Sequence, residues 1–307
     1  MAVNKSTEYT NGRIIMSSDR QIEHSQNFIR HPKLVSQLLE LTNISPTDLV
    51  IEIGPGTGMI TRELAKTAGR VIAIERDRRF SEGLSKINGV SNLQLVLGDF
   101  MQWQLPREDY KVFSNIPFNY TSDIVSKLTT SDRKPSDIYL IMQETASHRF
   151  IGTPYEKNSQ ISTLLSIEFS VEILQKINRD NFEPRPNVSI VFTHFAKRSM
   201  PLVPSVNHQD FRDFVIYGYN QWSPTVIDAF RKIFTNRQRT IITRSINLTG
   251  LKPSDLNIEQ WIELYNTYCR YVDEDKKNLV RGSEKRLSKN QSKLTKQHRT
   301  RKPFGQK

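Results

Sequence analysis

The stretch Val50-Ile51-Glu52-Ile53-Gly54-Pro55-Gly56-Thr57-Gly58 places three glycines directly after a short apolar run. Glycine lets the backbone approach a ligand closely and adopt conformations that other residues avoid. The spacing differs from the G-x-G-x-x-G of dinucleotide sites, because the third glycine comes one residue earlier. A glycine turn with no pyrophosphate to hold suits S-adenosylmethionine, and a tight structural turn is the alternative interpretation.

Short apolar runs alternate with helix-length segments around this loop, which predicts an α/β fold with a parallel sheet wrapped by helices. The strand candidates are residues 49–53, 71–74, 93–97, 112–113 and 138–142. A later apolar run at 188–195, entered through Pro184 and Pro186, is expected to close the sheet. The fold class that follows is a Rossmann-like α/β domain.

Beyond about residue 200 the pattern changes to helical segments rich in aromatic and basic residues, namely 211–220, 225–234 and 258–268. Pro201 and Pro204 mark a linker, so a small C-terminal helical domain follows it. The predicted divisions are an N-terminal extension over 1–20, a catalytic domain over 21–199, a helical RNA-binding domain over 200–275 and a basic, disordered tail over 276–307.

The net charge of +12 is concentrated at the C-terminal end of the chain. Residues 276–307 contain twelve Lys or Arg and one acid, Glu284, whereas the rest of the chain has 32 basic and 31 acidic side chains. Such a segment is a candidate arm for contacting RNA, and a solubilising disordered end is the alternative. Sensitivity of binding to salt would separate the two.

The single cysteine, Cys269, excludes an internal disulfide and a thiol cluster for zinc or iron–sulfur ligation. Neither a signal-peptide pattern in the first twenty residues nor an apolar stretch long enough to span a bilayer is present in the sequence. We therefore expect a soluble cytoplasmic protein, monomeric, without a metal and without a membrane partner.

Two acidic residues follow predicted strands. Glu75 comes 21 residues after Gly54, where an acid can accept hydrogen bonds from ribose hydroxyls. Asp99, in Leu97-Gly98-Asp99-Phe100, is expected to accept from the adenine amino group of the cofactor. Each acid alone is more often a helix cap or a surface residue. Their shared position after strands favours the cofactor role, because open α/β sheets bind ligands at that edge.

The motif Ser114-Asn115-Ile116-Pro117-Phe118 ends the fourth predicted strand. An adenine amino group is a poor nucleophile, and hydrogen-bond acceptors can favour the more tetrahedral nitrogen that attack requires. The Asn115 side-chain oxygen and the Ile116 carbonyl are such acceptors, while Pro117 fixes the turn. Phe118 is expected to stack on the target base. A proline turn capped by asparagine, with a core phenylalanine, is the alternative.

These residues together resemble the rRNA adenine N6-methyltransferases, and within them the erythromycin-resistance (Erm) family that acts on 23S rRNA. The resemblance covers about residues 20 to 270. It is carried by 25–29, 52–58, Glu75, 98–100, 115–118 and 182–188.

The resemblance implies S-adenosylmethionine as cofactor, 23S rRNA as partner, and resistance to macrolide, lincosamide and streptogramin B antibiotics. It adds Asn27 and Ile29 to Gly54, Gly56, Glu75, Asp99 and Asn115 as implied cofactor contacts. It also implies that Phe182 lies near the target base. Whether one or two methyl groups are added to N6 is left open.

Parts of the same pattern occur in three other classes of protein. The small-subunit dimethyltransferases of the KsgA type share most of these motifs, but typically have Asn-Leu-Pro-Tyr where this chain has Asn115-Ile116-Pro117-Phe118. A non-catalytic RNA-binding protein on the same scaffold is a second alternative. A nicotinamide dehydrogenase is disfavoured by the glycine spacing and by the Asn-Ile-Pro-Phe segment.

Overall fold

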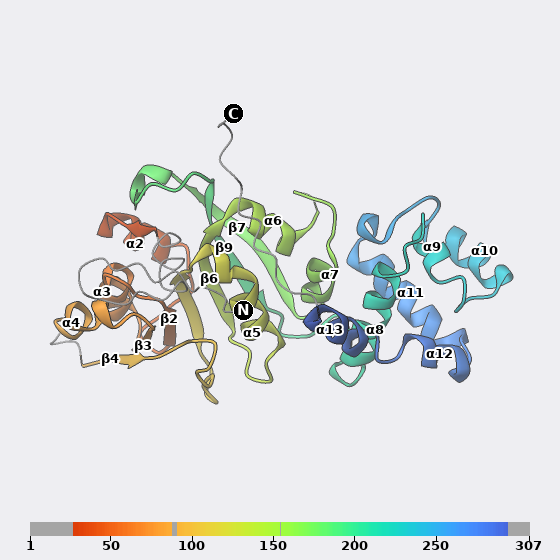
Figure 1. Ribbon diagram of the computed structural model, residues 1–307, viewed down its shortest axis with the longest axis horizontal. Helices are drawn as coiled ribbons and strands as arrows, with labels where there is room; N and C mark the ends of the chain where they lie inside the picture. The colour runs from red at the N-terminus through yellow and green to blue at the C-terminus, as the bar shows by residue number, and fades with distance from the viewer. Residues whose placement is uncertain (1–26, 88–90, 154, 294–307) are drawn as a thin grey trace, which may run out of the picture. The chain divides into compact units, whose positions relative to one another are not determined.

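The computed structural model describes residues 27–87, 91–153 and 155–293. The chain divides into two compact units (Figure 1). The sheet unit comprises the chain up to Ile151 together with Glu168–Met200, and the helical unit comprises Gly152–Ile167 together with the chain from Pro201 onward. The last of the three division points lies between Met200 and Pro201. The predicted N-terminal extension, 1–20, lies outside the described residues.

The sheet unit is built on a seven-stranded sheet with the order β4-β3-β2-β5-β6-β9-β7. Its strands are β2 (Leu49–Ile53), β3 (Arg70–Glu75), β4 (Leu93–Leu97), β5 (Lys111–Asn115), β6 (Asp137–Gln143), β7 (Phe169–Ile177) and β9 (Ile190–Lys197). The five strands from β4 to β6 run parallel, as predicted. Every residue of β2 is buried, as in parallel sheets that are covered on both faces, and the strand is flanked by β3 and β5.

The antiparallel side of the sheet differs from the prediction. The run at 188–195 does not close the sheet, since β9 pairs with β6 on one side and with β7 on the other. The edge strand is β7, which the sequence analysis missed. Only its end residues, Phe169 and Ile177, are buried, and the polar residues Ser170, Glu172 and Lys176 are exposed. The strand therefore contains no continuous apolar run.

Helices and a small ladder complete the sheet unit. The helices are α2 (Pro32–Leu39), α3 (Met59–Thr67), α4 (Ser81–Ser85), α5 (Thr121–Thr130) and α6 (Glu144–Ile151). Apart from the main sheet, β1 (Phe28–Ile29) pairs antiparallel with β8 (Phe182–Glu183). The carboxyl ends of β2, β3, β4 and β5 meet at one edge of the sheet, which is where such folds bind ligands.

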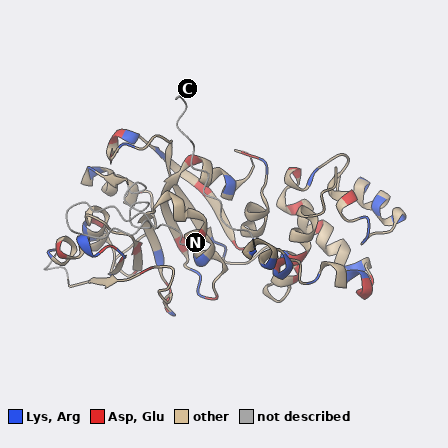
Figure 2. Cartoon of the chain, in the orientation of Figure 1, with Lys and Arg blue, Asp and Glu red and all other residues tan. Residues whose placement is uncertain are grey.

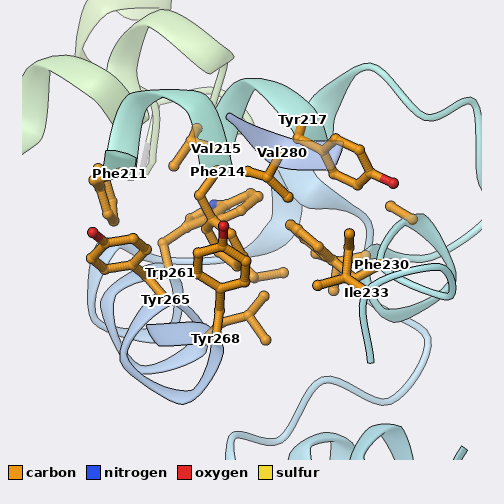
Figure 3. Packing of buried hydrophobic residues seen from close by; sticks show 14 of the residues in the cluster. Phe211, Phe214, Val215, Tyr217, Phe230, Ile233, Trp261, Tyr265, Tyr268 and Val280 are labelled. Atoms are coloured by element: carbon orange, nitrogen blue, oxygen red, sulfur yellow. The ribbon is translucent and has the colours of Figure 1, made fainter. Parts of the chain in front are cut away.

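The helical unit has its own apolar core, shown in Figure 3. Its helices are α7 (Gln160–Ser166), α8 (His208–Tyr219), α9 (Val226–Ala229), α10 (Asn236–Ser245), α11 (Ile258–Tyr271), α12 (Glu274–Val280) and α13 (Ser283–Ser292). Phe214 of α8 stacks on Phe230 with ring centroids 4.5 Å apart and meets Trp261 of α11 edge-on. None of the helices in the described ranges is long and apolar enough to cross a bilayer.

Two predictions about this unit need correction. Residues 152–167 were assigned to the catalytic domain, but Leu164 and Ile167 are buried in the core of the helical unit, where Thr163 hydrogen-bonds Tyr219 at 3.1 Å. The predicted disordered tail begins instead with α12 and α13. Val280 is buried in the same core, so burial offsets the high charge of this segment; residues 294–307 lie outside the described part.

Candidate active site

The glycine turn joins β2 to α3 and adopts a backbone that favours glycine. Gly54, Gly56 and Gly58 have φ values of 68°, 52° and 77°. The Gly54 N–H donates to the carbonyl of Ile74 at 2.9 Å, which ties the turn to the end of the neighbouring strand β3. Side chains at these positions would be strained, so the three glycines are explained by backbone conformation.

Glu75 at the end of β3 is the acid that holds this turn. Its carboxylate accepts the Gly56 N–H at 2.9 Å and the Asp77 N–H at 2.7 Å. The side chain is 2% exposed, and this burial raises the pKa of Glu75 above its ordinary value. A buried carboxylate fixed by two backbone donors keeps lone pairs that can accept hydrogen bonds from ligand hydroxyls.

A first cavity, which we call the acidic cavity, opens beside Glu75 and encloses about 560 Å³ that includes space open to solvent. Asp99 lines it, and its Oδ1 accepts the Met101 N–H at 2.8 Å. Ile53, Ile74 and Ile124 provide apolar walls. Apolar walls with acids among them suit the adenine ring and the ribose of a nucleoside.

A second cavity of about 490 Å³, the asparagine cavity, lies against the first, because Gly54 and Pro117 line both. Asn115 and Phe118 line it from the end of β5 and the turn that follows. Asn27 and Ile29 line it from the β1 side. The motif at 115–118 and the segment at 27–29 therefore meet at one place.

The orientation of the Asn115 amide is set by a long-range hydrogen bond. Its Nδ2 donates to the backbone carbonyl of Asn27 at 2.6 Å. Since a carbonyl oxygen can only accept, the amide nitrogen must face Asn27. The Oδ1 atom remains as the acceptor that Asn115 can offer to a ligand in the cavity.

Two predicted site residues occupy other places than expected. Phe182 is 1% exposed and lines neither cavity, because pairing with Ile29 across the β1–β8 ladder turns it into the apolar core. This position gives no support to the contact with the target base, which stays a prediction. Gly56 is buried and also lines neither cavity. It acts through Glu75, to which its N–H donates.

Several residues that shape the site were missed by the sequence analysis. Phe28 lines the asparagine cavity and covers Gly56, where a Cβ would lie 2.6 Å from the phenylalanine ring. Tyr120 and Ile124 line the acidic cavity from the segment after the motif. Phe28 belongs to the segment 25–29 that carries part of the family resemblance, whereas the apolar Ile124 has no local signal because only folding brings it to the cavity.

Glu52 is a buried acid beneath the glycine turn. It is 1% exposed, and its Oε2 has no hydrogen-bond partner in the part of the chain that the structure describes. Burial raises the pKa of Glu52 to about 8, and the charge of Glu75 acts in the same direction. The side chain is therefore largely protonated near neutral pH.

S-adenosylmethionine fits these residues. The carboxylates of Glu75 and Asp99 are acceptors of the kind that a ribose and an adenine amino group require, and the acidic cavity has apolar walls beside them. The adjoining asparagine cavity leaves a second place for the group that accepts the methyl. The arrangement can therefore hold two ligands next to each other, with Pro117 between them.

The chain is similar to known ribosomal RNA methyltransferases. The sequence pattern of the family described as ribosomal RNA adenine dimethylase matches residues 18–269. An rRNA adenine N-6-methyltransferase of Bacillus licheniformis is 27% identical over 249 residues, covering 80% of this chain and 86% of that protein. A ribosomal RNA small subunit methyltransferase A of Moorella thermoacetica is 28% identical over 261 residues, 79% of this chain and 90% of that protein. The crystal structure of the 23S rRNA methyltransferase ErmE has the same fold, with a TM-score of 0.73, 24% identity and coverage of 80% of this chain and all of that chain.

Proposed function

Because the chain belongs to the ribosomal RNA adenine dimethylase family, we propose that it transfers methyl from S-adenosylmethionine to N6 of one adenine in 23S rRNA. The observation that carries the proposal is the Asn115–Pro117 turn between the two cavities, with the Asn115 amide oriented by Asn27. This turn supplies acceptors where an adenine amino group would have to lie. A 23S target further implies resistance to macrolide, lincosamide and streptogramin B antibiotics. We place the enzyme in the cytoplasm, where its rRNA substrate would be found.

In this mechanism the residues position and orient the reactants. When bound, the cofactor would supply an electrophilic methyl group on its sulfonium; the S–C bond breaks as the N6–C bond forms, and the neutral thioether S-adenosylhomocysteine is the leaving group. Glu75 and Asp99 hold the nucleoside part of the cofactor in the acidic cavity. Asn115 Oδ1 and the Ile116 carbonyl accept the two N6 hydrogens, which favours a tetrahedral nitrogen, and Phe118 stacks on the extruded base. The N6 proton is lost to water after transfer, so no strong general base is required.

The test is methyl transfer from labelled S-adenosylmethionine to purified, unmodified 23S and 16S rRNA, with the modified base mapped by mass spectrometry. We expect N6-methylated adenine in 23S rRNA alone. The number of methyl groups at that base would be read from the same spectrum.

The relative from Moorella thermoacetica makes the small subunit the main alternative target. Two adjacent dimethyladenines in 16S rRNA would replace the 23S proposal by that one. A protein that binds RNA but transfers no methyl group to either rRNA would contradict both, and would favour a non-catalytic RNA-binding role.

A further inference from the structure

The chain continues beyond the part that matches its family. The match ends at residue 269, within α11, whereas α12 and α13 follow at Glu274–Val280 and Ser283–Ser292. Helix α13 lies within residues 276–307, which hold most of the excess positive charge, and α12 begins two residues before them. Figure 2 shows lysine and arginine positions on α13 in blue. The two helices lie outside the part that the family pattern matches, and they contribute no residue to the two cavities.

Helix α13 is attached to α8 at its N-terminal end. Asp213 of α8 is buried, and its carboxylate accepts the N–H groups of Gly282 at 2.7 Å and of Glu284 at 2.8 Å. It therefore serves as the cap of a helix distant in sequence. The left-handed backbone of Gly282, with φ 75°, allows the sharp entry, and Leu287 packs against the core of the helical unit.

Glu284, the one acid within residues 276–307, also contacts α8. Arg212 Nε donates to both carboxylate oxygens of Glu284 at 3.0 Å, and Gln209 donates to Oε2 at 3.0 Å. The hydrogen bond from Arg212 lowers the pKa of Glu284, so this carboxylate stays ionised and paired with α8. It is therefore not available to neutralise lysines elsewhere on α13.

Three lysines repeat along α13 and its C-cap at intervals of four residues: Lys285, Lys289 and Lys293. Residues four apart share one face of a helix, about 6 Å apart along its axis. All three are exposed, and no carboxylate pairs with them among the residues that the structure describes. The helix thus presents an uncompensated row of cations.

We propose that Lys285, Lys289 and Lys293 form a phosphate-binding edge for RNA, separate from the cavities that hold the cofactor and the target base. The proposal rests on the proposed function, which makes RNA the substrate. A row of ammonium groups without aromatic side chains contacts phosphates and carries no base recognition. This edge therefore strengthens and positions RNA binding without selecting the modified adenine.

The experiment compares the full-length wild type with K285Q/K289Q/K293Q and with the charge-retaining control K285R/K289R/K293R. Binding of a 23S rRNA fragment and of an unrelated hairpin of equal length is measured by fluorescence anisotropy at several salt concentrations. Each phosphate contact contributes about 0.7 to 0.9 to the slope of log K against log salt. We expect the glutamine variant to lose about two from this slope and about tenfold or more in affinity at low salt, for both RNAs.

The arginine variant should bind like the wild type, and the maximal methylation rate at saturating RNA should be unchanged in all three proteins. Glutamine is a good helix former, and circular dichroism checks that α13 persists. Equal slopes and affinities for the glutamine variant and the wild type would overturn the proposal. The charge-reversed variant K285E/K289E/K293E must bind RNA more weakly than the glutamine variant. Equal binding by these two variants would also overturn the proposal.

Two other outcomes separate this inference from the proposed function. If the wild type methylates 23S rRNA but the glutamine variant keeps its salt slope, the phosphate edge is wrong and the activity stands. If the wild type methylates neither rRNA, the activity fails, while the slope still decides whether the edge binds RNA. Binding of anionic phospholipid vesicles in place of RNA, lost in the same variant, would overturn the choice of RNA.

Discussion

At the scale of single residues, the site depends on groups whose hydrogen bonds are fixed before any ligand arrives. Asn115 is oriented by the carbonyl of Asn27, and Glu75 is held by two backbone N–H groups. Such fixed groups favour the transition state because they need no reorganisation during the reaction. The functional role of each can therefore be tested by one substitution.

Replacing Asn115 by Ala should lower the rate of methyl transfer about 100-fold or more, because one acceptor for the N6 hydrogens is lost. Phe118→Ala should also reduce the rate severely, while Phe118→Tyr, which keeps the ring, should retain most of it. The measurement is incorporation of labelled methyl into RNA, with thermal unfolding as a check on the fold. Unchanged turnover in both alanine variants would contradict the assignment.

Glu52 gives a prediction about pH. Its pKa of about 8 in the folded state lies above the ordinary value of 4.5, so the folded protein binds a proton that the unfolded chain releases. The stability of the wild type should therefore fall as pH rises from about 4.5 to 8 and level off above that. Glu52→Gln removes this effect, and its advantage over the wild type should grow by a few kcal/mol between pH 6 and pH 9.

Urea unfolding at the two pH values measures this difference. A wild type and variant that respond equally to pH would show that Glu52 is ionised in the folded protein. Glu75, whose pKa burial also raises, is unchanged in the variant and leaves a residual pH dependence of the same sign.

At the scale of elements, the positions of neighbouring segments are decided by close backbone approaches and by caps. The β1 strand brings Phe28 over the glycine turn, and α8 supplies the cap of α13. Both contacts join segments that are far apart in sequence. Each can be weakened without altering the secondary structure of the partner.

Gly56→Ala should destabilise the protein and lower its affinity for S-adenosylmethionine about tenfold or more. The new Cβ would meet the Phe28 ring at 2.6 Å, in addition to the cost of about 1 to 2 kcal/mol for a left-handed backbone. Gly250→Ala is the matched control, because its φ is 72° and nothing lies within 4 Å of its Cβ. Adding Phe28→Ala to Gly56→Ala should restore part of the stability, and failure to do so would show that the clash is unimportant.

Asp213→Ala should loosen α13 by about 1 to 2 kcal/mol, since two backbone N–H groups at its start lose their acceptor. Amide hydrogen exchange over 283–292 should become faster. The control is Asp210→Ala, at an exposed position of α8, the helix that also holds Asp213. It should change amide exchange over 283–292 little. Equal exchange in wild type and Asp213→Ala would mean that packing alone holds α13.

At the scale of the whole molecule, one cluster of buried apolar residues belongs to the sheet unit and another to the helical unit. All cofactor contacts proposed here belong to the sheet unit, whereas the lysine row belongs to the helical unit. Chemistry and the added RNA contact are thus assigned to different units.

Phe214→Ala should destabilise the helical unit by about 3 to 5 kcal/mol, because this buried ring contacts Phe230, Trp261 and Tyr268. Affinity for S-adenosylmethionine, measured by calorimetry at a temperature where the sheet unit is folded, should stay close to that of the wild type. Loss of cofactor binding together with the unfolding of the helical unit would show that the two units fold as one.

The sequence by itself determined the five parallel strands, the glycine turn and the acids after the strands, because local patterns encode burial and backbone preference. It thereby placed Gly54, Glu75, Asp99 and Asn115 at one edge of the sheet. Only the tertiary structure decided that Phe182 is buried and that β7 forms the edge of the sheet. It alone oriented Asn115 through Asn27 and folded α13 onto Asp213. Such contacts join residues distant along the chain, so neither partner carries a local signal of the other.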